Sequence, residues 1–313
     1  MSTSFTDWVE KVYRRVYSGS SEATVTLDDP NGLPHTISDT DTTFSVYGQN
    51  TGMRVGVILA VDYELMYVTA WSPSSQTSGS VTVVRGYAGS VAASHTDSLV
   101  YIQPRYSRFD VGVALNDELA RLSSPGMGLF QVKTQTFTFN PVYMGYDLSQ
   151  AVSDSFIDIM EVRYKIPYPT RNYPAVKKWK VLRSIPDVGV FPSGQGLVIY
   201  EGGYPGQPVF AQYSCAFSQL DPSMWTSNTD VAAATGMTKT MLDIPPLGAE
   251  IQLTLPREIR RNFMDVQPDP RRAPEVPAGS VANSVQAMQI LYNNRVSEEA
   301  ERLMRQYTRV EGW

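Results

Sequence analysis

The sequence of 313 residues contains one cysteine, Cys215, and two histidines, His35 and His95. A single cysteine excludes a disulfide within the chain and a thiolate metal cluster, and two histidines are too few for a typical zinc site. We therefore expect no metal and no cofactor. The scarcity of cysteine also favours assembly inside a cell, where thiols stay reduced.

Long apolar runs and an excess of positive charge are also missing. No stretch approaches the roughly 18 apolar residues of a membrane span, and the N-terminus, Met1–Trp8, has neither the basic start nor the apolar run of a signal peptide. We expect no contact with a membrane. The net charge of -5 argues against a protein that binds nucleic acid by general electrostatics, because phosphate binding needs a concentrated positive field.

No catalytic motif is present. His95 with Asp97 lacks the Gly-x-Ser-x-Gly elbow of a hydrolase, His35 lies in a turn-like stretch, and Gly194-Gln195-Gly196 lacks the third glycine of a dinucleotide fingerprint. A wall-degrading hydrolase would need two catalytic carboxylates facing a cleft, and the sequence singles out no such pair. We expect no enzymatic activity and no catalytic, cofactor-binding or metal-binding residue.

What the sequence does contain is enough apolar material for a substantial core. Hydrophobic residues make up 42% of the chain and charged residues 18%, which is typical of a soluble globular protein that is rather poor in charge. The length exceeds the common range of about 100–200 residues for one domain. Two folded units with helical attachments are therefore expected.

Hydrophobic periodicity predicts the first part of the chain. Three-four spacing predicts a helix over residues 5–17, which we expect to dock on the chain's own body rather than on a neighbouring subunit. A spacing of two then predicts strands at Ala23–Leu27, Thr42–Tyr47, Arg54–Val61, Glu64–Trp71, Ser80–Arg85 and Leu99–Gln103. Asp62-Tyr63 is predicted as a tight turn and Ser72–Gly79 as an exposed loop.

The second part follows the same logic. A helix from Ser107 to Leu122 is predicted to separate the first strands from a second set at Thr134–Phe139, Phe156–Ile166, Lys178–Ile185, Gly196–Glu201 and Val209–Gln219. The proline-containing stretch Ile166–Pro174 is predicted as a long loop. Helices are expected at residues 243–264, with a kink at Pro256, and at residues 281–307, with a proline-rich connector over residues 265–279.

These elements predict an α+β protein. It should have two antiparallel β-modules, a small barrel or sandwich and then a sandwich, joined by a helix, with an N-terminal helix and a C-terminal helical region. The predicted segments are an N-terminal docking helix (1–18), a first β-module (19–106), a connecting helix (107–126), a second β-sandwich (127–220) and a helical C-terminal region (221–313).

A glycine-punctuated stretch, Thr82–His95, follows one of the predicted strands. Gly86 and Gly89 flank Tyr87-Ala88, and glycines in such positions usually supply backbone angles with φ above zero. We interpret Arg85, Gly86, Tyr87 and Gly89 as a loop built for shape, in which the glycines matter more than His95.

Arginines concentrate in one region near the C-terminus, at Arg257, Arg260, Arg261, Arg271 and Arg272. A solvated helix is the plainer interpretation, and contact with DNA or an acidic partner is the functional one. The residues expected to contact a partner are Trp8, Arg257, Arg260, Arg261, Arg271, Arg272, Val285, Met288, Tyr292 and Leu303.

Several stretches together carry a resemblance. The hairpin Arg85–His95, the stretch Pro104–Asp110 with Ala114–Leu119, and the ending Asn294–Leu303 are similar to head-to-tail connector (neck or adaptor) proteins of long-tailed bacteriophages, notably those of actinobacterial hosts. Gly89-Ser90 stands where the pattern has Gly-Thr, a mild departure.

The resemblance implies a structural virion protein, assembled in the host cytoplasm and located in the neck at the head-tail junction. It implies a ring of this chain, twelvefold to match a portal, that continues the DNA channel. The implied partners are further copies, the portal protein, the next neck or tail-terminator protein, and genomic DNA that passes without specific binding.

One alternative comes from a different functional class. A tail-tip, baseplate or fibre-base protein would attach to a host-surface glycan through exposed tyrosine and tryptophan side chains. Oligomer symmetry separates the two, because fibre proteins are usually trimers whereas an adaptor that matches a portal forms a twelvefold ring.

Overall fold

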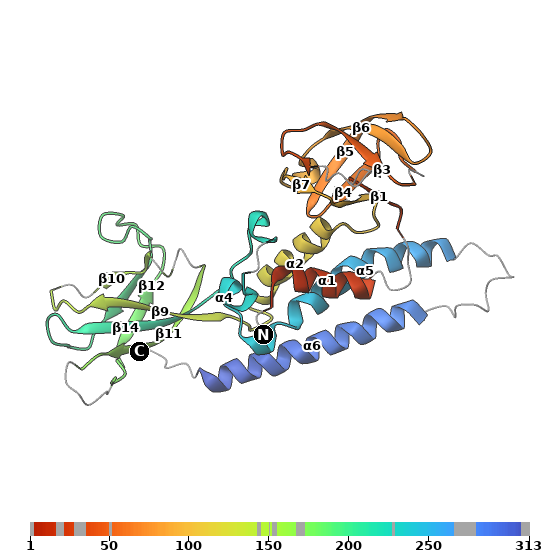
Figure 1. The fold of residues 1–313 in the computed structure, drawn as a ribbon. Coiled ribbons are helices and arrows are strands. Elements are labelled where there is room, and N and C mark those ends of the chain that lie inside the picture. The colour runs from red at the N-terminus through yellow and green to blue at the C-terminus, as the bar shows by residue number, and fades with distance from the viewer. Residues whose placement is uncertain are drawn as a thin grey trace. The chain divides into compact units, whose positions relative to one another are not determined.

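The computed structural model describes residues 3–16, 22–27, 36–49, 52–142, 145–149, 151, 155–166, 173–226, 229–265 and 280–307, without side chains at 256–265 and 280–284. It contains helices and antiparallel sheets in similar proportion, 31% and 30%, which confirms the α+β class (Figure 1). The chain divides into two compact units. Unit 1 comprises Met1–Glu118, Gln219–Ala234 and Leu242–Tyr292, and unit 2 comprises Leu119–Ser218, Thr235–Met241 and Asn293–Trp313.

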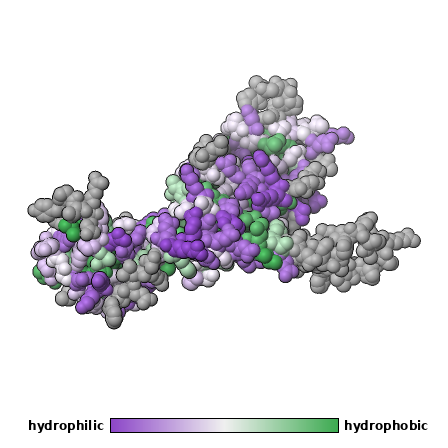
Figure 2. Space-filling view, turned by 90° about the horizontal axis from the view of Figure 1, so that it is seen from below, coloured by the Kyte–Doolittle hydropathy of each residue, from purple (hydrophilic) through white to green (hydrophobic). Residues whose placement is uncertain are grey.

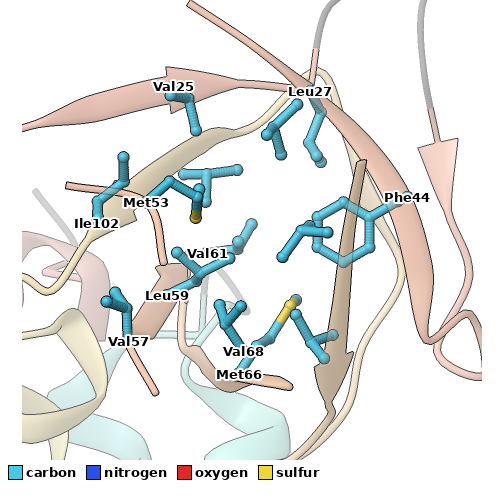
Figure 3. Packing of buried hydrophobic residues seen from close by; sticks show 14 of the residues in the cluster. Val25, Leu27, Phe44, Met53, Val57, Leu59, Val61, Met66, Val68 and Ile102 are labelled. Carbon is cyan, nitrogen blue, oxygen red and sulfur yellow. The ribbon is translucent and has the colours of Figure 1, made fainter. Parts of the chain in front are cut away.

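Unit 1 contains a closed antiparallel barrel of six strands in the order β1-β3-β6-β5-β4-β8. These strands are β1 (Thr24–Thr26), β3 (Thr43–Tyr47), β4 (Ile58–Val61), β5 (Glu64–Pro73), β6 (Ser78–Val84) and β8 (Leu99–Ile102). Their inward residues are apolar and fill the interior, as Figure 3 shows for Leu59, Met66 and Phe44. All six predicted strands have a counterpart, although β4 begins at Ile58 and not at the predicted Arg54. Closure into a barrel leaves no sheet edge open between β1 and β8.

Two features of the barrel differ from the sequence prediction. The stretch Ser72–Gly79 is not a loop throughout, because β5 continues to Pro73 and β6 begins at Ser78. The strands extend because Ser72 and Pro73 pair with Ser80 and Gly79. The bare Gly79 also leaves room for the Trp71 indole, since a Cβ there would lie 2.1 Å from its Cη2. A short pair, β2 (Thr36–Ile37) with β7 (His95–Thr96), was not predicted.

The N-terminal helix α1 (Phe5–Val16) docks within unit 1, as predicted. Phe5 and Trp8 are buried, and the Phe5 ring stacks on Trp225 with centroids 5.3 Å apart. Trp225 lies against α2 (Arg108–Leu122) at Gly112, where a Cβ would come within 2.6 Å of the indole. A helix glycine therefore makes room for the aromatic cluster.

The other long helices are α5 (Ile244–Asp265) and α6 (Ser280–Gln306). Helix α5 begins with two prolines in its first turn, where a missing N–H is tolerated, and it continues as a helix through Pro256. In unit 1 the buried Glu118 of α2 accepts a hydrogen bond of 2.5 Å from the Tyr292 hydroxyl of α6 and lies against Gly248 of α5. This contact joins three helices.

Unit 2 contains two three-stranded antiparallel sheets, in the orders β11-β14-β9 and β10-β13-β12. The strands are β9 (Gln131–Thr138), β10 (Gly145–Asp147), β11 (Phe156–Tyr164), β12 (Trp179–Leu182), β13 (Gly196–Ile199) and β14 (Pro208–Cys215). Both sheets contribute side chains to one apolar core, for example Val162 and Ala211 from one and Leu197 and Ile199 from the other. This arrangement is the predicted sandwich, with β10 as an additional strand.

Short helical elements complete the described chain: η1 (Tyr87–Gly89), η2 (Pro222–Met224), α4 (Val231–Thr235) and η3 (Lys239–Met241). The predicted proline-rich connector and most of the predicted loop Ile166–Pro174 lie outside the described residues.

Candidate functional site

The loop that connects β6 to β7 has the backbone shape expected from its glycines. Gly86 has φ +61° and Gly89 has φ +86°, and Ala88 between them also lies in the left-handed region at φ +55°. At Gly86 the space is restricted as well, because a Cβ would lie 3.1 Å from the carbonyl oxygen of Ser90. The shape role predicted for this loop is thus supported by its backbone angles.

Arg85 fastens the start of this loop to the barrel. Its Nε and Nη2 donate to the two carboxylate oxygens of Glu64 at 2.7 and 2.8 Å, a paired geometry that lysine cannot reproduce. Its Nη1 donates to the carbonyl oxygens of Ser38 and Asp41, and Nη2 also donates to that of Ala93. The Arg85 side chain therefore connects the end of its own strand to three other segments, around residues 38–41, 64 and 93.

Glu64 is the acceptor at the centre, and only 1% of it is exposed. Besides Arg85, the backbone N–H groups of Gly86 and Ala93 donate to it at 3.1 and 3.0 Å. Burial alone would raise the pKa of this carboxyl, but the hydrogen bonds from Arg85, His95 and the two amides outweigh that effect and lower the pKa to about 2. Glu64 is therefore charged at neutral pH and fixes the start of the loop.

His95 completes the group, which we call the carboxylate cluster: Asp62, Glu64, Arg85 and His95. The His95 ring lies between two acids, with Nδ1 2.9 Å from Asp62 Oδ2 and Nε2 2.9 Å from Glu64 Oε2. Burial acts to lower the pKa of His95, yet the two carboxylates outweigh it and raise the pKa above the ordinary value, while the bond to His95 lowers the pKa of Asp62. With His95 charged, two anions and two cations balance.

The position of His95 adds to the interpretation drawn from the sequence. We expected it to matter less than the glycines, and that ranking stays a prediction; what the sequence did not show is that His95 is 4% exposed and bonded to two acids. The turn predicted at Asp62-Tyr63 is present and aims the Asp62 carboxylate at the imidazole. The sequence does show Asp62 and Glu64 close together at the end of a predicted hairpin. Their partners Arg85 and His95, however, lie 21 to 33 residues further along the chain, so the sequence alone does not pair them.

The arrangement holds a loop in place. The Ser90 hydroxyl, which could otherwise suggest a nucleophile, accepts from Leu65 N–H at 2.9 Å and donates to the Tyr87 carbonyl at 2.9 Å. The Arg85 guanidinium, the Glu64 carboxylate and both ring nitrogens of His95 likewise have partners within the chain. In the described part of the chain, no group of three or more histidine, cysteine or acidic residues is arranged to hold a metal ion.

The held loop presents apolar side chains outward. Tyr87 stacks on Tyr67 with ring centroids 5.3 Å apart, and Val84 and Val91 are 50% and 57% exposed. We call Tyr67, Val84, Tyr87 and Val91 the loop surface. In Figure 2, which shows one face of the molecule, hydrophilic residues predominate among those drawn in colour, with smaller apolar areas between them.

The other predicted contact residues divide into three groups. Trp8, Val285, Tyr292 and Leu303 are buried within the chain, so their side chains serve its own packing and are not available on its surface. Met288 is partly exposed. The side chains of Arg257, Arg260 and Arg261 lie outside the described part, as do residues Arg271, Arg272 and His35.

Exposed apolar residues of α6 were missed by the sequence reasoning. Ile290, Leu291 and Met304 are 54%, 52% and 64% exposed, and they lie off the stripe of Val285, Tyr292 and Leu303. The signal was present in the sequence, because these residues are apolar positions outside the stripe that already accounts for the packing of the helix.

Among the helices that the structure describes, none combines the length and apolar character that crossing a bilayer requires. Comparison with protein-family models gave no match, and a search among curated proteins returned no relative.

Proposed function

We propose that this protein is a structural subunit of the head-to-tail connector of a long-tailed bacteriophage, and that it forms a ring between portal and tail. The observation that carries the proposal is the Arg85–His95 hairpin, whose sequence resembles that of connector proteins. The carboxylate cluster supports the proposal, because the paired, buried contacts of Glu64 with Arg85 fix the conformation of this loop, as a structural role requires.

A ring needs two different surfaces that meet in neighbouring copies. The loop surface is one candidate, and the exposed Ile290 and Leu291 of α6 are another, since large apolar side chains on a surface favour protein contact. These replace Trp8 and Tyr292, which are buried. The proposed partners remain further copies, the portal, the next neck protein and DNA in the channel, and the proposed location is the virion neck.

The proposal is tested by imaging the purified full chain, alone and mixed with the portal of the same phage, and by labelling the protein on intact virions. Twelvefold rings and label at the head-tail junction are the expected results. Trimers, or label at the distal end of the tail, would instead favour the attachment protein.

A surface variant sharpens the test. Ile290→Asp combined with Leu291→Asp should reduce ring formation at least about tenfold, because two charges are placed in an apolar contact. Val142→Asp is the matched control, since Val142 is 80% exposed and belongs to neither candidate surface. Equal ring formation by both variants would remove α6 from the interface.

A further inference from the structure

The outer face of the sheet β11-β14-β9 in unit 2 carries an ordered set of side chains. Cross-strand pairing places Thr134, Gln212 and Glu161 in one row, and Thr136, Phe210 and Arg163 in the next. Residues directly opposite each other in antiparallel strands share a face of the sheet. The alternate residues of β14, including Val209 and Ala211, are buried in the core, so Phe210 and Gln212 point outward.

This face is hollowed. A depression of about 270 Å³ is lined by Thr134, Glu161, Arg163, Phe210 and Gln212. The Tyr173 ring, which is 43% exposed, meets the Phe210 ring nearly edge to face, at 72° and 5.8 Å between centroids. The aromatic rings of Phe210 and Tyr173, which we call the aromatic wall, thus lie beside the polar side chains that line the depression.

The charges in the depression compensate each other. Arg163 Nη2 lies 2.7 Å from Glu161 Oε2, and this pairing raises the pKa of Arg163. A bound anion would have to displace Glu161 from Arg163, and a bound cation would have to displace Arg163 from Glu161. The depression is therefore suited to a neutral ligand.

The hydrogen-bonding groups are of mixed kind. Glu161 only accepts, Arg163 only donates, and the hydroxyl of Thr134 and the amide of Gln212 do both. A ligand with several adjacent hydroxyls matches such a set, because each hydroxyl both donates and accepts. The aromatic wall in turn suits a ligand with an apolar C–H face.

We propose that this depression is a binding site for one unit of a neutral carbohydrate. The sugar's hydroxyls would meet Gln212, Glu161 and Arg163, and its C–H face would pack on Phe210. The proposal goes beyond the connector function and is independent of it, since it rests on unit 2 alone.

A partner protein suits the face less well than a sugar does. The depression is small, it has one central aromatic residue among polar neighbours, and about 1,000 Å² of complementary surface is needed for a stable protein interface. A single sugar ring makes few contacts, so the expected dissociation constant is about 1 mM.

Saturation-transfer NMR on the full chain tests the site directly. The probes are the methyl glycosides of glucose, galactose, mannose, arabinose and N-acetylglucosamine, with glucuronic acid as a charged comparison. We expect transfer to at least one neutral glycoside, strongest at the protons of one ring face. Phe210→Ala should abolish it, and Gln212→Ala should weaken binding at least about tenfold.

Tyr204→Ala is the matched control, because Tyr204 is 77% exposed in the same unit but does not line the depression. It should leave the signal unchanged. Thermal melting checks that each variant folds, and Gln212→Ala, a change on the sheet surface, keeps the test valid if Phe210→Ala unfolds. Absence of transfer to every neutral probe, transfer that survives in the folded variants, or transfer to glucuronic acid alone would overturn the proposal. The proposal would also be wrong if the natural chain bound no sugar and Phe210→Ala changed the oligomeric state, because the depression would then be part of a protein interface.

Discussion

Glu64 illustrates how strongly one buried carboxylate depends on its donors. It accepts from Arg85, His95 and two backbone amides while almost completely removed from water. When one partner of a buried ion pair is removed, the charge that remains loses its main compensation, and the loss of stability is about 3–5 kcal/mol. Arg85, interpreted from the sequence only as part of a loop built for shape, is therefore the main partner of a buried charge.

The first prediction concerns Arg85. Arg85→Met keeps much of the side-chain volume but removes both guanidinium hydrogen bonds to the buried Glu64 carboxylate, so the free energy of unfolding should fall by about 3–5 kcal/mol. Urea denaturation followed by circular dichroism measures it. Arg54→Met is the control, since Arg54 is exposed on the same barrel and its loss should change stability by less than about 0.5 kcal/mol. Equal effects would show that the cluster contributes nothing.

The second prediction concerns pH. The pKa of His95 is raised above its ordinary value of 6.5, so its contribution to stability is complete below that value and is lost as the pH rises through the folded-state pKa. The pKa of Glu64 is lowered to about 2, so its contribution is complete above its ordinary 4.5 and is lost as the pH falls toward 2. The melting temperature of the natural chain should therefore decline on the alkaline side of 6.5.

His95→Gln separates this decline from other titrations. Glutamine stays neutral, so the variant should be less stable at pH 6 and should lose less stability than the natural chain between pH 6 and 9. Melting curves across this range give the measurement. Parallel curves for the two proteins would mean that folding does not raise the pKa of His95.

At the residue scale the sequence predicted backbone shape better than side-chain partnership. Positive φ at Gly86 and Gly89 follows from the residue type alone, because few other residues adopt that conformation without strain. The partnership of His95 with Asp62 depends on the register of strands far apart in the chain, and no local pattern encodes it.

At the scale of elements, glycines set how closely helices approach. Gly248 of α5 lies against the Glu118 carboxylate, which the Tyr292 hydroxyl also contacts, and a Cβ there would be 2.1 Å from Glu118 Cδ. Glu118 is 1% exposed and has little room to move. The contact between α2, α5 and α6, which we call the joint, therefore requires a residue without a side chain at position 248.

The third prediction follows from that joint. Gly248→Ala should destabilise the chain by about 1–3 kcal/mol through overpacking, despite the better helix propensity of alanine. Gly126→Ala is the control, because nothing lies within 4 Å of its Cβ position, and it should be neutral or slightly stabilising. Thermal denaturation ranks the two. A stabilised Gly248→Ala would mean that Glu118 moves aside easily.

Long periodic elements were predictable, and short ones were not. Alternation in β5 and β11 and helical spacing in α1 and α6 are sustained over many residues. The pairs formed by β2, β7 and β10 are two or three residues long, and they form because neighbouring strands present a partner. A pattern of period two cannot be recognised over so short a length.

At the scale of the whole molecule, each unit is assembled from separated stretches of chain. Trp225 packs on Phe5 and against Gly112 in unit 1, although these residues are far apart in sequence. The sequence predicted consecutive segments, because periodicity is local, whereas the grouping of segments depends on which apolar faces meet.

The fourth prediction concerns DNA. A channel wall should let a polyanion slide, so the full chain should bind duplex DNA weakly, without sequence preference and less at higher salt. Fluorescence anisotropy with two unrelated duplexes at about 50 and 200 mM salt measures this.

Charge reversal at Arg257 and Arg260 should weaken ring or portal association more than DNA retention. Tight, sequence-specific binding would contradict the connector proposal.

The contacts of Arg85 also determine when the loop can be secured during folding. They join segments around residues 38–41, 64 and 93, which become neighbours only after the barrel strands have paired. We therefore expect the carboxylate cluster to form late in folding, after the rate-limiting step. Its loss should accelerate unfolding while leaving the folding rate nearly unchanged, as stopped-flow kinetics on Arg85→Met would reveal. The cluster would accordingly govern how long a folded subunit persists rather than how quickly it is made.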